Sequence, residues 1–121
     1  MADTAPRRGE IWVANTGEPP RRHWVVIASV DGRNQSPRAD SVLIVPFGSK
    51  PAKAPTIMPF EAGETGLPGP SYLRGELIQS LLKSRLVERL SRPLSDRRMR
   101  ELCLAIRRAF DPDAPADNPR I

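Results

Sequence analysis

Two continuous apolar runs, residues 24–28 and 42–47, constrain the fold of this chain more than any other feature. Each run is rich in β-branched and aromatic residues and is bounded by turn-forming residues. Runs of this length and composition predict strands. Because polar residues do not alternate with the apolar ones, both faces of each strand are expected to be covered. The chain should therefore form a sheet covered on both sides or a small closed barrel of bent strands.

Weaker signals predict the elements around these two strands. Residues 10–14 predict a first strand that ends at a cluster of turn formers. Residues 30–40 predict a loop with room for one helical turn, and the proline-rich segment 51–59 predicts an edge strand or an irregular arm. Residues 71–82 predict another strand, in which Gly75 marks a bulge or kink or, alternatively, a point where a ligand approaches the backbone closely.

One helix is expected near the C-terminus. Ser95 is a suitable N-cap, and Asp96 places a negative charge at the positive end of the helix dipole. Apolar residues at helical spacing predict one buried stripe, made of Met99, Leu102, Cys103, Ile106 and Phe110. Asp111-Pro112 should end the helix. The arginines of the opposite face are expected to be solvated charges on a helix that lies against the sheet, rather than groups that read nucleic acid.

The length allows one folded body. A chain of 121 residues can form one hydrophobic core but not two. Small polar residues and prolines at both ends predict a flexible lead over residues 1–7 and a disordered tail over residues 112–121. The folded domain is then expected over residues 8–111.

Charge and composition limit the classes of function. The net charge of +5 comes chiefly from arginine, which favours phosphate groups and acidic protein segments as partners. Cys103 is the only cysteine and His23 the only histidine, so one chain can build neither a disulfide framework nor a Cys/His zinc site. We expect no metal and no cofactor, and any metal used in catalysis would have to be bound by carboxylates. No apolar stretch approaches membrane length and no signal-peptide core is visible, so a cytoplasmic protein without membrane contact is expected.

Arg74 and Glu76 form the most informative polar pair. Side chains two residues apart in a strand project from the same face, so this guanidinium and this carboxylate should lie next to each other. The pair is either an ion bridge or an acid/base site. Most exposed Arg/Glu pairs are only solvated charges, so the pair gains meaning from the motifs that accompany it.

The order of the motifs along the chain resembles that of the MazF/PemK (Kid) toxin family. The resemblance spans residues 8 to 110 and rests on Gly9-Glu10-Ile11-Trp12, Arg22, Val45-Pro46-Phe47-Gly48-Ser49, Lys83-Ser84-Arg85-Leu86 and Leu94-Ser95-Asp96. It implies a mainly β fold with a C-terminal α-helix, an SH3-like barrel of the CcdB/MazF type. It also implies a homodimer that cleaves single-stranded RNA independently of the ribosome.

The resemblance also implies catalytic roles. Glu76 matches the base that takes the 2′-hydroxyl proton, and Arg74 matches the acid and phosphate partner. Because an arginine holds its proton strongly, electrostatic stabilisation is the safer role for Arg74. Arg22 and Ser49, together with the Gly48 amide, would bind the scissile phosphate. We therefore expect Arg22, Arg74 and Glu76 to converge on one phosphodiester and to give 2′,3′-cyclic phosphate and 5′-hydroxyl ends without a metal.

Further residues are expected to bind the RNA. Lys50 and Lys53 would line a basic groove together with the arginines, while Asn34 and Gln79 could read base edges. His23 stands where most relatives have proline. It either adds a titrating group beside the phosphate or packs as part of the wall.

The chain also departs from the family pattern. Gly48 replaces the first hydroxyl residue of a pair, and the loop over residues 14–21 is short. A binding-only member of the fold, like the gyrase-poisoning CcdB branch or a nucleic-acid binder, is therefore the alternative to a ribonuclease, and a purely structural domain is a third reading. For the ribonuclease, the family implies a natural inhibitor: an antitoxin whose acidic, disordered C-terminal arm fills the groove and folds as it binds.

Overall fold

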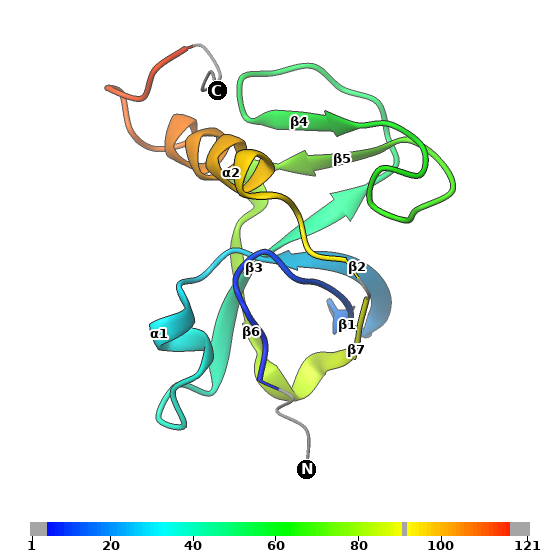
Figure 1. Ribbon diagram of the computed structural model, residues 1–121, viewed down its shortest axis with the longest axis vertical. Helices are drawn as coiled ribbons and strands as arrows, with labels where there is room; N and C mark the ends of the chain where they lie inside the picture. Colours follow the sequence, from blue (N-terminus) through cyan, green and yellow to red (C-terminus); the bar gives the residue numbers. More distant parts are fainter. Residues whose placement is uncertain (1–4, 91, 117–121) are drawn as a thin grey trace.

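The computed structural model describes residues 5–90 and 92–116, which form a seven-stranded antiparallel sheet and a C-terminal helix (Figure 1). The strand order is β4-β5-β3-β2-β1-β7, and β6 pairs with β3 outside this path. The strands are β1 (Ile11–Thr16), β2 (Arg21–Ile27), β3 (Ser41–Gly48), β4 (Ile57–Phe60), β5 (Ser71–Arg74), β6 (Gln79–Leu82) and β7 (Leu86–Arg89). The helices are α1 (Asp31–Asn34) and α2 (Asp96–Arg108), with short 3-10 turns η1 (Gly75–Leu77) and η2 (Lys83–Arg85). The expected fold class, mainly β with a C-terminal α-helix, is confirmed.

β3 organises the sheet because it pairs with three other strands. One edge of β3 pairs with β2, from Ile44 opposite Ile27 to Pro46 opposite Val25. The other edge pairs first with β6 and then with β5. The segment 71–82 therefore forms two strands rather than one, and η1 separates them at Gly75. The kink expected at Gly75 is confirmed, whereas β7 was not expected from the sequence.

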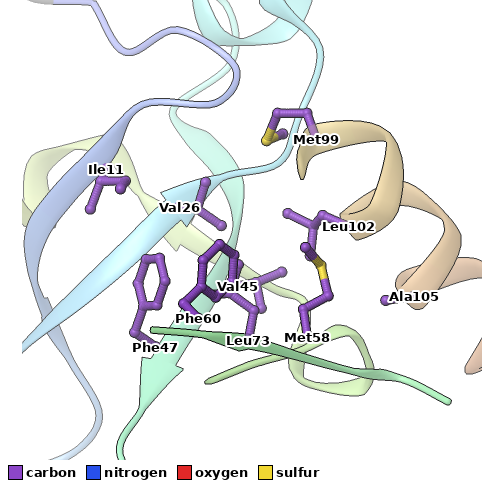
Figure 2. Packing of buried hydrophobic residues seen from close by; sticks show 10 residues of the cluster. All are labelled: Ile11, Val26, Val45, Phe47, Met58, Phe60, Leu73, Met99, Leu102 and Ala105. Carbon is purple, nitrogen blue, oxygen red and sulfur yellow. The ribbon is translucent and has the colours of Figure 1, made fainter. Parts of the chain in front are cut away.

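Side chains of β2 and β3 pack into two apolar clusters, one on each face of the sheet. The first cluster, between the sheet and α2, contains Ile11, Val26, Val45, Phe47, Met58, Phe60, Leu73, Met99, Leu102 and Ala105 (Figure 2). The second contains Trp12, Ala14, Val25, Ile27, Val42, Ile44 and Leu81. The expectation that the two apolar runs are covered on both faces is confirmed.

The helix α2 begins as predicted, but its buried face differs. The Ser95 hydroxyl accepts a hydrogen bond from the Arg98 amide at 3.2 Å, as an N-cap should. Cys103 is exposed and Phe110, beyond the helix end, is 75% exposed, so their assignment to the buried stripe is wrong. The buried face is centred near Leu102 and Ala105, and the rotation of 100° per residue turns Cys103 to solvent.

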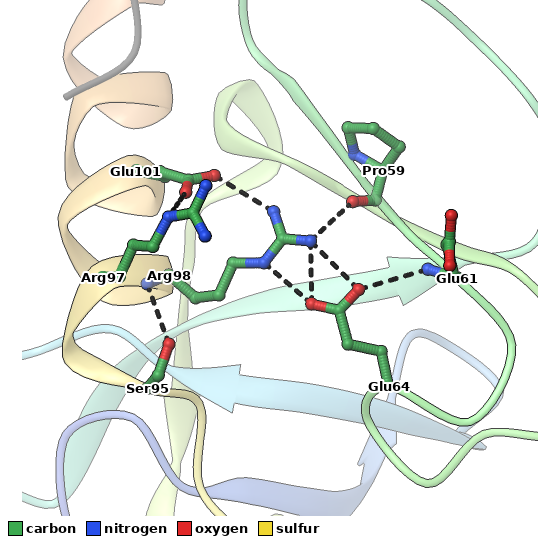
Figure 3. A network of polar contacts seen from close by, with 7 residues as sticks. All are labelled: Pro59, Glu61, Glu64, Ser95, Arg97, Arg98 and Glu101. Atoms are coloured by element: carbon green, nitrogen blue, oxygen red, sulfur yellow. Dashed lines mark hydrogen bonds and ion pairs between the residues drawn. The ribbon is translucent and has the colours of Figure 1, made fainter. Parts of the chain in front are cut away.

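Arg98 ties α2 to β4 and to the loop that follows it (Figure 3). Its guanidinium donates to Glu64 from Nε at 2.8 Å and from Nη2 at 3.0 Å, and Nη1 donates to Glu101 at 3.0 Å. The same group lies 4.3 Å from the centre of the Phe60 ring and donates to the Pro59 carbonyl at 3.3 Å. The buried Glu101 is thereby paired rather than left as an isolated charge.

Each end of the described chain forms a hydrogen bond with a neighbouring segment. In the lead, Pro6 is buried and its carbonyl accepts from Nε2 of Gln35 at 2.7 Å. In the tail, the Pro115 carbonyl accepts from Nε of Arg108 at 2.8 Å. Residues 1–4 of the expected lead and 117–121 of the expected tail lie outside the described residues.

Gly75 is required by the close approach of α2. A Cβ at this position would lie 2.5 Å from the Ala105 carbonyl carbon and 2.6 Å from the Ile106 nitrogen, distances that real Cβ contacts do not reach. The backbone that approaches Gly75 therefore belongs to the helix. The alternative prediction, that a ligand approaches the backbone at Gly75, is therefore wrong.

We predict that Gly75→Ala destabilises the fold by about 1–3 kcal/mol, the usual cost of overpacking, because α2 must move away from η1. Gly48→Ala is the matched control, since a Cβ at Gly48 meets nothing within 4 Å. Chemical denaturation of both variants checks this. Equal stability of the two variants would contradict the packing described here.

Asp31 attaches the N-terminal segment to the start of α1. Its Oδ1 accepts from the Arg8 amide at 2.6 Å and from Nδ2 of Asn34 at 3.0 Å. The hydrogen bond from the Arg8 amide is the main cause that lowers the pKa of Asp31, with Asn34 adding to it and partial burial opposing it.

A lowered pKa in the folded state means that the stabilisation from Asp31 is complete above the carboxyl's unfolded pKa of about 3.9 and is lost as the pH falls through the folded value. We predict that Asp31→Asn lowers the stability at neutral pH. We also predict that the variant loses less stability than the wild-type protein when the pH falls below about 4. Thermal melts of both proteins between neutral and acidic pH measure this. A stability difference that does not shrink at low pH would contradict the role of the charge.

Candidate functional site

The Arg74–Glu76 pair lies where β5 ends and η1 begins. Nη1 of Arg74 is 3.6 Å from Oε2 of Glu76, and the two side chains are 35% and 37% exposed. This contact confirms the prediction that the two side chains are neighbours. The strand alternation on which the prediction rested is wrong, because β5 ends at Arg74 and Glu76 lies in η1. The half-exposed carboxylate and guanidinium can both reach a ligand at the surface, whereas a buried pair could not.

Thr56 holds Glu76 from the facing segment. Its Oγ1 donates to Oε1 of Glu76 at 2.7 Å, while its carbonyl accepts from the Gly75 amide at 2.7 Å. The backbone bond aligns the two segments and the hydroxyl bond orients the carboxylate. Sequence reasoning missed Thr56. The one sequence feature that could have identified Thr56 is its hydroxyl group, which comes directly after Pro55 in a segment of small residues, apolar residues and lysines.

The end of β3 runs beside β5. Gly48 is directly opposite Tyr72, and Phe47 is opposite Leu73. Ser49, Lys50 and Lys53 follow in an exposed segment. Within residues 5–90 and 92–116, the side chains of these three residues form no hydrogen bond or ion pair with the protein, so they are free to meet a ligand.

Arg22 and His23 lie at the exposed start of β2, and strand alternation sends them to opposite faces. Arg22 shares its face with Trp24 and Val26, whereas His23 shares the face of Val25. Nδ1 of His23 lies 2.7 Å from the Thr16 hydroxyl and 3.3 Å from the Arg21 carbonyl.

No ion pair or hydrogen bond joins Arg22 to the Arg74–Glu76 pair in the part of the chain that the structure describes. Leu73 and Val26 belong to the same cluster, and Arg22 shares the face of Val26. Because Arg74 alternates with Leu73 along β5, its side chain projects from the face opposite to that of Arg22. The convergence of the three residues on one phosphodiester therefore stays a prediction, and it depends on how far the long Arg22 side chain reaches around the open end of β2.

Of the two residues expected to read bases, one is misplaced. Asn34 is fully buried. Its amide oxygen accepts from the Ser29 hydroxyl, and Nδ2 donates to the Ser29 carbonyl and to Asp31. The assignment of Asn34 to RNA binding is wrong, because its amide orders the loop after β2 instead. Gln79 is exposed on β6 and donates to the Leu77 carbonyl at 3.1 Å, which leaves its amide oxygen available.

The described residues contain no group of three or more His, Cys, Asp or Glu side chains placed to hold a metal ion. None of their helices has the length and apolar character needed to span a bilayer. The site contains a carboxylate oriented by a hydroxyl, an adjacent guanidinium and exposed lysines in the segment before β4. Such a set can accept a proton and stabilise a neighbouring anion.

Comparisons with known proteins agree with this description. A family model described as "PemK-like, MazF-like toxin of type II toxin-antitoxin system" matches residues 7–110. A relative named probable endoribonuclease MazF5, from Mycobacterium tuberculosis (strain ATCC 25618 / H37Rv), is 33% identical over 106 residues, which cover 88% of this chain and 94% of that protein.

Solved structures share the fold. An endoribonuclease in complex with its cognate antitoxin, from a mycobacterial species, has a TM-score of 0.74 at 23% identity and covers 92% of this chain and 100% of its own. The Mycobacterium tuberculosis toxin MazF-mt6 has a TM-score of 0.73 at 22% identity, with coverages of 86% and 98%. The expected SH3-like barrel of the CcdB/MazF type is confirmed.

Proposed function

Because the chain belongs to the PemK-like, MazF-like toxin family of type II toxin–antitoxin systems, we propose that it is an endoribonuclease that cleaves single-stranded RNA. The observation that carries the proposal is the half-exposed Arg74–Glu76 pair, with Thr56 orienting the carboxylate. A surface ion pair that only kept the protein soluble would need no such support. We further propose that the reaction needs no metal.

The proposed reaction is an attack of the RNA's own 2′-oxygen on the adjacent phosphorus. Glu76 takes the 2′-hydroxyl proton as the O2′–P bond forms. The P–O5′ bond then breaks, which leaves a 2′,3′-cyclic phosphate on one fragment, and the departing oxygen takes a proton from solvent water to become a 5′-hydroxyl on the other. The hydroxide so formed takes the proton held by Glu76, which restores the carboxylate. Arg74 stabilises the charge that gathers on the phosphate oxygens beside Glu76.

Other residues are proposed to hold the substrate. Arg22 and Ser49, with the Gly48 amide, bind the scissile phosphate, and Lys50 and Lys53 attract the backbone on either side of it. His23 and Gln79 remain candidates for RNA contacts because both are exposed.

The proposed assembly follows the family. The working form is a homodimer in the cytoplasm, neutralised by an antitoxin whose acidic, disordered C-terminal arm occupies the RNA site and folds as it binds. The net charge of +5 and the exposed Lys50 and Lys53 favour such an acidic arm as a partner.

We predict that purified protein cleaves a mixed single-stranded RNA in EDTA and leaves 5′-hydroxyl and 2′,3′-cyclic phosphate ends. Glu76→Gln should reduce the cleavage rate about a hundredfold or more because no base remains, and Arg22→Ala should abolish detectable cleavage through loss of phosphate binding. Both residues are exposed, so the thermal midpoint should hardly change.

Fragment ends are identified by their reactivity with kinase and phosphatase. Cleavage that requires added magnesium would overturn the metal-free mechanism. Tight RNA binding without any cleavage would favour the binding-only alternative, and an equal loss of fold and activity in Glu76→Gln would make that residue structural.

We predict that Thr56→Val lowers the cleavage rate about tenfold, the equivalent of one hydrogen bond of about 1.4 kcal/mol, while Thr56→Ser retains most of it. Valine has the shape of threonine without the hydroxyl, and both variants keep the backbone bond to Gly75. The test compares single-turnover rates with melting temperatures. A serine variant as slow as the valine variant would show that Thr56 acts through packing rather than through its hydroxyl.

A further inference from the structure

Arg108, the last residue of α2, joins the helix to the segment 51–56 that precedes β4. Its Nη1 donates a hydrogen bond to the Pro55 carbonyl at 3.1 Å, and its Nε donates to the Pro115 carbonyl at 2.8 Å. One guanidinium can serve both carbonyls because its N–H groups form a planar, rigid fork. None of the roles proposed above uses Arg108.

The carbonyl that Arg108 holds lies in the middle of a turn. The Ile57 amide donates to the Ala54 carbonyl at 3.0 Å, so Pro55 and Thr56 are the two central residues of a four-residue turn. The Pro55 carbonyl belongs to the peptide group between these two residues. Because a peptide group is planar, a hydrogen bond that fixes this carbonyl also fixes the nitrogen of Thr56. The bond from Arg108 therefore restricts the direction of the Thr56 side chain.

One face of α2 contacts both segments that form the Thr56–Glu76 hydrogen bond. Ala105 packs directly against Gly75, the residue before the carboxylate in η1. Arg108 comes three residues after Ala105, which places it on the same face of the helix. It holds the carbonyl directly before Thr56, whose hydroxyl donates to Oε1 of Glu76 at 2.7 Å. The helix thus sets where the hydroxyl lies relative to the carboxylate.

The neighbouring Arg107 points elsewhere. Its guanidinium donates to Oδ2 of Asp111, from Nε at 3.2 Å and from Nη2 at 3.0 Å. Arg107 is exposed, whereas Arg108 is half-buried. Of these two arginines, only Arg108 donates to the segment 51–56 within residues 5–90 and 92–116. Arg107 therefore offers a control of the same residue type and charge, one position away.

We propose that Arg108 is a positioning residue of the ribonuclease: it holds the turn at residues 54–57 against the end of α2 and thereby keeps the Thr56 hydroxyl on the Glu76 carboxylate. This inference rests on the proposed function. Arg108 takes no part in the bond changes and acts only through Thr56. Its loss can therefore slow cleavage no more than loss of the Thr56 hydroxyl, for which about tenfold is expected.

The first test compares Arg108→Met with Arg107→Met. Methionine keeps an apolar stem of similar length, and both variants lose one positive charge, so any general weakening of RNA attraction is common to both. Arg108→Met should lower the single-turnover cleavage rate about three- to tenfold, whereas Arg107→Met should cleave like the wild-type protein. Both should bind equally well to an RNA with 2′-deoxyribose at the scissile nucleotide, which cannot be cut. Equal cleavage rates of the two variants would overturn the inference.

A double-mutant cycle with Thr56→Val tests whether Arg108 acts through the hydroxyl. The double variant should be no slower than Thr56→Val alone, because the group that Arg108 positions is already absent. If Arg108 had a separate structural role, the rate of the double variant would fall by the product of the two single reductions. That result would overturn the inference.

Amide hydrogen exchange gives a readout that needs no catalysis. The Ile57 amide closes the turn, and the Gly75 amide donates to the Thr56 carbonyl at 2.7 Å. Both amides should exchange about threefold faster or more in Arg108→Met than in Arg107→Met, while amides of the β2–β3 ladder should be unchanged. Faster exchange throughout the sheet would indicate a global loss of stability and would contradict a positioning role.

The outcomes separate this inference from the proposed function. If the wild-type protein cleaves RNA but the two arginine variants agree in rate and in exchange, the ribonuclease stands and the positioning role is overturned. If the wild-type protein cleaves no RNA yet only Arg108→Met loosens the turn, the ribonuclease is overturned and the hold of Arg108 on Thr56 stands.

Discussion

The direct contact between the Gly75 backbone and the backbone of α2 is the constraint on which the rest of the structure depends. No side chain separates them, since any Cβ at this position would collide with Ala105 and Ile106. The contact sets the depth at which α2 covers the first apolar cluster, and it also sets the point where the chain leaves β5 for β6. Arg74 and Glu76 stand on either side of this glycine, so one packing contact fixes both the helix and the candidate active site.

The polar groups of the site lie at the ends of strands because the side chains in the middle of the strands pack into the two apolar clusters. β2 and β3 bury side chains on both faces, which leaves only their exposed ends and adjoining segments for chemistry. Arg22 and His23 are the second and third residues of β2, Ser49 follows β3, and Glu76 lies in η1 directly after β5. The sheet thereby presents these side chains at its surface, where they stay accessible.

Two contacts at the site come from parts of the chain that a local reading would treat as connections. Thr56 orients the Glu76 carboxylate from the segment before β4, and residues 51–54 of the same segment line a hollow beside Tyr72. The prolines of this segment keep it out of the sheet. They hold it as an irregular arm over the face of β5 that carries Arg74, where a regular strand would close the space.

The sequence alone determined the strands of the two apolar runs, the Ser95 cap, the adjacency of Arg74 and Glu76 and the family. Each depends on local spacing or on an ordered set of motifs. The tertiary structure decided the rest: that β5 and β6 are separate strands, that Asn34 is buried while Cys103 and Phe110 are exposed, and that Thr56 supports Glu76. Those outcomes depend on which distant segments of the chain come into contact. Whether Arg22 approaches Arg74 and Glu76 depends on how far its side chain extends past the end of β2. Residue type and spacing determine neither outcome, because burial and contact are properties of the packed chain.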